Sequence, residues 1–91
     1  MIFQKWLKII KDFKNISDME CPHCNKKSLD YLYIGDEETK IGYLQAWCNN
    51  CLNGIHISRV KIPDGAKMLP FDTKENLNEI IPTYQKVTPE E

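Results

Sequence analysis

Apolar residues near the N-terminus recur at the spacing of a helix. At about 100° per residue, seven apolar side chains between residues 2 and 13 fall within an arc of about 160°, and lysines occupy much of the opposite side. The apolar set is Ile2, Phe3, Trp6, Leu7, Ile9, Ile10 and Phe13. The pattern predicts an amphipathic helix over residues 1–14, followed by a polar connector over residues 15–20.

Three later segments are rich in residues that favour strands. Residues 29–34 and 41–47 flank an acidic turn and predict a β-hairpin, and residues 55–62 predict a third strand. In this third strand the apolar face changes side near Ser58 and Arg59. A β-bulge there would account for the change, because one extra residue turns every later side chain to the other face.

The C-terminal third contains turn signals and one short apolar stripe. Residues 72–75 resemble a capping box, which predicts a short helix that carries Leu77, Ile80 and Ile81 and ends at Pro82. Residues 83–91 predict a flexible tail. The 91 residues are short enough for a single domain, with a turn and the short helix over residues 63–82.

Four cysteines form the strongest chemical signal in the chain. Cys21 and Cys24 make one Cys-x-x-Cys pair, and Cys48 and Cys51 make a second pair after 23 intervening residues. Two intervening residues let both sulfurs of a pair face one centre, and the longer interval lets a hairpin run out and return. The spacing predicts one tetrahedral site for a single structural Zn²⁺.

These two pairs resemble the knuckles of the zinc-ribbon, or rubredoxin-like, class of small metal-binding domains, over about residues 19–62. Cys-Pro-x-Cys is that class's first knuckle, and Cys21-Pro22-His23-Cys24 matches it. The whole chain also looks like short uncharacterised bacterial proteins that carry one zinc ribbon. The resemblance implies a small α+β fold, in which a three-stranded antiparallel ribbon lies between the N-terminal helix and a short C-terminal helix.

Residues that tolerate a left-handed backbone follow both pairs. Asn25 directly follows the first pair, and residues 53–54, Asn-Gly, follow the second pair closely. Glycine is common directly after each knuckle in the zinc-ribbon class, whereas Asn25 and Leu52 occupy those positions here.

Two other uses of the cysteines are open to the same spacing. Cys-Pro-His-Cys also occurs in oxidising thioredoxin-like enzymes, but that chemistry needs a helix after the first cysteine, and here a predicted strand follows. A rubredoxin-like iron site for electron transfer would use the same four thiolates. Zinc is the preferred interpretation, and rubredoxin-like electron transfer is the alternative.

The histidines and aromatic residues offer little catalytic chemistry. His23 is expected as an exposed knuckle residue, and His56 as a solvent-facing residue opposite Ile55 and Ile57. No nucleophile arrangement is evident, so the protein is expected not to be an enzyme.

Four aromatic residues of the hairpin would form one strip if its strands paired them, and sheet packing is the preferred role for Tyr31, Tyr33, Tyr43 and Trp47.

Net charge and composition narrow the choice of partner. The formal charge of −1 lacks the strong positive charge that is typical of nucleic-acid-binding domains. The charge is unevenly distributed, because residues 1–16 are basic and residues 17–38 are acidic. We expect a non-enzymatic module that binds a partner protein. The alternative is a small nucleic-acid-associated regulator that uses Tyr31, Tyr33, Tyr43 and Arg59.

Compartment and helix packing follow from the remaining features. No secretory signal or apolar run of membrane-spanning length is evident, which predicts a cytoplasmic protein without an integral membrane segment. The apolar face of the N-terminal helix is expected to pack on the ribbon. Self-association through that helix is a further option.

Overall fold

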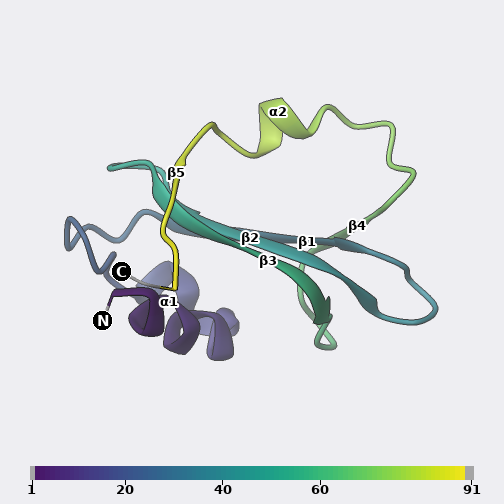
Figure 1. Ribbon diagram of the computed structural model, residues 1–91, viewed down its shortest axis with the longest axis horizontal. Coiled ribbons are helices and arrows are strands. Elements are labelled where there is room, and N and C mark those ends of the chain that lie inside the picture. The colour runs from purple at the N-terminus through teal and green to yellow at the C-terminus, as the bar shows by residue number, and fades with distance from the viewer. Residues whose placement is uncertain (1, 90–91) are drawn as a thin grey trace.

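The computed structural model describes residues 2–89, which form one sheet with helices on both of its faces. Helix α1 (Ile2–Lys11) and the 3₁₀ helix η1 (Phe13–Asp18) lie on one face, and the single-turn helix α2 (Leu77–Ile80) lies on the other (Figure 1). The α+β fold expected from the sequence is therefore confirmed, with one helix longer than two turns among the described residues.

The centre of the sheet is the predicted antiparallel meander. Strand β1 (Leu29–Gly35) pairs with β2 (Ile41–Cys48), and β2 pairs with β3 (Asn53–Lys61). These strands match the three predicted segments to within two residues at each end.

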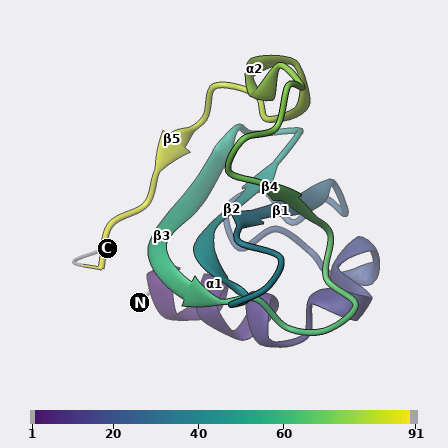
Figure 2. The same ribbon diagram turned by 90° about the vertical axis from the view of Figure 1, so that its right-hand side faces the viewer.

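Two short parallel strands extend this meander, so the prediction of a three-stranded antiparallel ribbon is wrong. Strand β4 (Met68–Pro70) lies beside β1, and β5 (Gln85–Lys86) lies beside β3. The result is a mixed five-stranded sheet in the order β4-β1-β2-β3-β5 (Figure 2). Strands of two or three residues are too short to show an alternating pattern, so neither could be recognised from the chain.

The C-terminal segment also differs from expectation. The capping box at residues 72–75 does not open a helix: the backbone N–H of Glu75 bonds the Thr73 hydroxyl, and α2 begins only at Leu77. The expected flexible tail carries β5 and the buried Val87, whose N–H donates to the carbonyl of Gly54 at 2.7 Å. Residues 90–91 of that tail lie outside the described residues.

The predicted β-bulge is confirmed. Gly42 of β2 faces Val60, whereas Leu44 faces Ile57, so Tyr43 alone lies opposite Ser58 and Arg59. Arg59 adopts a left-handed backbone with φ of 59°. The extra residue shifts the in-and-out alternation of the later side chains of β3 by one position, which accounts for the change in its apolar pattern.

The first core lies between α1 and the sheet. Trp6 is fully buried, Ile9 is nearly so, and the partly buried apolar residues of α1 pack against the same cluster. Tyr31 and Tyr33 supply the sheet side of this core. The apolar face of α1 is thus covered within the chain by its own sheet, which is the packing expected from the sequence.

The strand register separates the four aromatic residues that were grouped in one strip. Tyr31 faces Ala46 and Tyr33 faces Leu44, so both tyrosines lie toward α1. Trp47 and Tyr43 lie on the other face, in or against a second core with Leu32, Ile34 and Ile81. The condition for a single aromatic strip is therefore not met, because directly paired residues share a face and this register pairs tyrosine with aliphatic residues.

Within residues 2–89, no helix is long and apolar enough to cross a membrane.

Candidate metal centre

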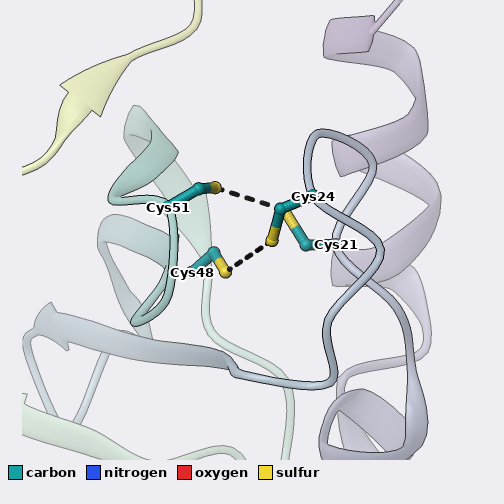
Figure 3. A group of neighbouring side chains, drawn as sticks. All are labelled: Cys21, Cys24, Cys48 and Cys51. Atoms are coloured by element: carbon teal, nitrogen blue, oxygen red, sulfur yellow. Dashed lines mark hydrogen bonds between the residues drawn. The ribbon is translucent and has the colours of Figure 1, made fainter.

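The four cysteines converge on one point, as their spacing predicted. Their sulfur atoms all lie within 4.8 Å of one another (Figure 3). The Sγ atoms of Cys21 and Cys51 are 3.6 Å apart, and those of Cys24 and Cys48 are 3.7 Å apart. All four are free thiols.

These separations suit a shared metal ion better than a disulfide. A disulfide needs sulfurs at about 2.05 Å. Four thiolates at about 2.3 Å from a tetrahedral Zn²⁺ lie about 3.8 Å from each other. The two shorter pairs are within about 0.2 Å of that edge, and separations of up to 4.8 Å would have to close by about 1 Å, so this cluster could hold a metal ion.

The β1–β2 hairpin brings the two pairs together. Leu29, at the start of β1, faces Cys48, at the end of β2, and the N–H of Asn49 donates to the carbonyl of Ser28 at 2.8 Å. The first pair lies in the loop that enters β1, and the second pair lies in the turn that leaves β2. The predicted path, out along one strand and back along the next, is what places the sulfurs side by side.

Both loops use the same backbone turn. The N–H of Asn25 donates to the carbonyl of Cys21, and the N–H of Leu52 donates to the carbonyl of Cys48, each at 2.9 Å. Asn25 and Leu52 have φ of 62° and 58°. The left-handed position after the first pair was predicted, but after the second pair it falls on Leu52 and not on residues 53–54.

Backbone N–H groups within the loops point at one sulfur of each pair. The N–H of His23 donates to Cys21 at 3.3 Å, and the N–H of Asn50 donates to Cys48 at 3.4 Å. Cys21 and Cys48 are also the two fully buried cysteines. These bonds partly replace the water that a buried thiolate loses.

Side-chain amides serve the other two sulfurs. Asn50 Nδ2 donates to Cys24, and Asn53 Nδ2 donates to Cys51, both at 3.4 Å. Every sulfur of the cluster therefore accepts at least one N–H, and each of these bonds by itself favours the thiolate form of the sulfur that accepts it. Asn50 contacts both pairs, because its backbone serves Cys48 and its side chain serves Cys24.

The environments of the thiols differ. Burial raises the pKa of Cys21 to about 12 and also raises the pKa of Cys48. The amide of Asn50, donating to the Cys24 sulfur, is the main cause that lowers the pKa of Cys24 to about 6. A bound divalent cation would convert all four to thiolates, because a coordinating thiol loses its proton.

His23 has a structural role that sequence reasoning missed. It is partly buried, and its Nε2 accepts a hydrogen bond from the indole Nε1–H of Trp6 at 3.1 Å. Trp6 is fully buried, so its N–H needs a protein acceptor. The position of Trp6 within the apolar arc was a signal that some acceptor must face it, although nothing in the pattern pointed to His23.

The other candidate residues are dispersed. Tyr31 and Tyr33 are buried in the first core, and only Tyr43 and Arg59 of the predicted nucleic-acid set line the same hollow on the other face of the sheet. His56 is exposed, as predicted, and its ring lies 5.3 Å from that of Tyr43.

Comparison with protein-family models, with curated proteins and with solved structures finds no significant match to this chain.

Proposed function

We propose that this protein is a non-enzymatic zinc-ribbon module that uses one structural Zn²⁺ to hold a protein-binding surface in shape. The observation that carries the proposal is the closed set of four cysteine sulfurs within 4.8 Å of one another. Four protein ligands fill a tetrahedral zinc ion, whereas a catalytic zinc ion keeps one position for water. Cys21, Cys24, Cys48 and Cys51 are the ligands in this proposal.

Metal binding would supply much of the stability of this chain. Structural zinc sites contribute about 10–16 kcal/mol of apparent binding free energy, and small domains have net stabilities of about 5–15 kcal/mol. The metal joins the entry to β1 with the exit from β2, and so fixes one end of the sheet. We therefore expect the metal-free chain to lose its cooperative fold.

Zinc is proposed over iron, although four thiolates suit both ions. Two Cys-x-x-Cys pairs at this separation are the usual ligand set of a structural zinc site, and this is the ground for preferring zinc. Native mass spectrometry of protein purified without added metal reports the ion and the stoichiometry together. One zinc per chain is expected, and a red sample with one iron per chain would overturn the proposal.

A protein partner is proposed over nucleic acid. Burial of Tyr31 and Tyr33 removes two of the four residues on which base stacking depended. Titration with single-stranded DNA and RNA at several salt concentrations tests this choice. Binding tighter than about 1 µM that weakens steeply with salt would favour the nucleic-acid alternative, because phosphate contacts release counterions.

A further inference from the structure

Helix α2 covers only one end of the sheet face that lies opposite α1. At the uncovered end lies a shallow hollow of about 370 Å³, which we call the aromatic groove. Its walls include Ile41, Tyr43, His56, Arg59 and Phe71. Phe71 is 61% exposed and Ile41 is 50% exposed, so the hollow presents two large apolar side chains to solvent. The other end of the face is filled by the second core.

Tyr43 is the centre of this groove. Its ring lies 5.3 Å from that of His56 in an edge-to-face arrangement and 6.3 Å from that of Phe71. The β-bulge holds the backbone here, because Tyr43 lies opposite the two bulged residues Ser58 and Arg59. Partial desolvation and then the charge of Lys86 lower the pKa of His56, which favours its neutral ring and adds to the apolar character of the groove.

A second hollow adjoins the groove and has the opposite chemistry. Phe71 lines both, and the acidic hollow, about 410 Å³, is also lined by four exposed carboxylates and by no lysine or arginine among residues 2–89. The four are Asp36, Glu37, Glu38 and Asp72. The charge therefore changes across Phe71, from Arg59 on the groove side to a cluster of negative charge on the other.

We propose that the aromatic groove binds an extended segment of a partner protein, in which an apolar residue is followed two positions later by lysine or arginine. The apolar side chain would contact Tyr43 and Phe71, and the cation would enter the acidic hollow. Alternate residues of an extended chain point the same way about 6.6 Å apart, which suits adjoining hollows. This inference rests on the proposed protein-binding function and gives it a site and a partner chemistry.

The charges favour a polypeptide over other occupants. Base-stacking surfaces combine aromatic rings with a cationic path for phosphates, whereas four carboxylates here would repel a phosphate backbone. A second copy of this chain offers cations on the exposed side of α1, at Lys5, Lys8 and Lys11, but the other exposed residue beside them, Gln4, is polar. That surface lacks the apolar side chain that the groove would bury.

The test is selection from a random peptide library displayed on phage, with the full zinc-loaded chain as bait. Enriched sequences are expected to share an apolar residue followed closely by lysine or arginine. Synthetic peptides of the enriched sequence are then titrated by fluorescence polarisation. Their affinity is expected to fall with rising salt, because the acidic hollow attracts the cation.

Matched variants locate the binding surface. Phe71→Ser is expected to weaken the peptide at least tenfold, whereas Ile80→Ser, which removes an exposed apolar residue on α2, leaves affinity unchanged. The double variant Glu37→Gln, Glu38→Gln is expected to weaken the peptide several-fold and to reduce its salt dependence. Glu75→Gln, an exposed acid outside both hollows, serves as its control. Zinc content and thermal melts verify that each variant is folded.

Other outcomes would overturn the inference in distinguishable ways. Enriched peptides that bind folded Phe71→Ser and the double glutamine variant normally would place the protein-binding site elsewhere and leave the proposed function standing. A failure to enrich any peptide would count against both. Tight, salt-sensitive binding of a single-stranded 20-nucleotide RNA that Phe71→Ser abolishes would assign the groove to nucleic acid. A dimer in sedimentation that Phe71→Ser converts to monomer would assign it to a second copy.

Discussion

Replacing His23 with alanine tests whether the contact between α1 and the first cysteine loop stabilises the fold. Trp6 is fully buried, and its Nε1–H donates to His23 Nε2 at 3.1 Å. His23→Ala leaves that N–H without its acceptor, and a buried donor without a partner costs about 1–3 kcal/mol. A loss of about 2 kcal/mol lowers the melting temperature of a domain of this size by about 8–16 °C.

A double-mutant cycle separates this hydrogen bond from the other contacts of His23. In Trp6→Phe the indole N–H is absent, so His23→Ala in that background is expected to cost only about 0.5 kcal/mol from lost ring contact. The coupling energy of the cycle is therefore expected to be about 1–2 kcal/mol. His23→Gln is the matched control, because its side-chain oxygen can accept a hydrogen bond near the position of Nε2, and we expect it to cost less than alanine.

The measurement is urea unfolding at a fixed free zinc concentration, since bound metal contributes to the apparent stability. Zinc content is measured for each variant, so that loss of metal is not mistaken for loss of the hydrogen bond. The reasoning is refuted if His23→Ala costs the same in the wild-type and Trp6→Phe backgrounds, to within about 0.3 kcal/mol. Equal stabilities of the alanine and glutamine variants would also count against it.

Three further predictions concern other parts of the chain. Cys48→Ser is expected to abolish stoichiometric zinc binding and the cooperative melt, measured by native mass spectrometry and circular dichroism, because it removes a buried ligand. Tyr84→Phe is expected to lower stability by about 1 kcal/mol in the same melts, because the hydroxyl, which donates to Gln45 Oε1 at 2.9 Å, is removed; an unchanged melting temperature would contradict this. In an NMR titration the pKa of His56 is expected below 6.5, because burial and the charge of Lys86 disfavour its charged form, and Lys86→Met is expected to raise the midpoint. Since the folded pKa is the lower one, stability should fall as the pH drops below 6.5.

The metal centre was the most predictable part of this protein. Cysteine ligands separated by two residues must share a turn, and a hairpin of suitable length must return the second pair to the first. The apolar arc of α1 and the bulge near Arg59 were equally local signals, and the structure has both. The helix and the bulge could be predicted because each depends on residues close together in the chain, and the metal centre because one hairpin joins its two cysteine pairs.

The left-handed residue of the second loop shows where local reasoning was less accurate. Glycine and asparagine are the residues expected at positive φ, and residues 53–54 offered both, yet Leu52 takes the position. The turn geometry is set by the two cysteines, so the residue directly after Cys51 must adopt it whatever its type. The constraint from the site outweighs the preference of leucine, which is a cost of about 1–2 kcal/mol.

Cysteine spacing and hydrophobic period together specify the hairpin, the helix and the convergence of the four sulfurs. They leave open the pairing of β4 and β5, the contact of Trp6 with His23, and the face on which each aromatic residue lies. Those depend on which edges and surfaces become neighbours after the chain has folded. A shift of one residue in the β1–β2 register would bring Tyr33 and Tyr43 to the same face. The alternation of the two strands alone fits both registers, and the folded turn at residues 36–40 fixes one of them, where the N–H of Asp36 donates to the carbonyl of Ile41 at 3.1 Å. The open aromatic groove depends on that register, because it places Tyr43 on the face opposite Tyr33.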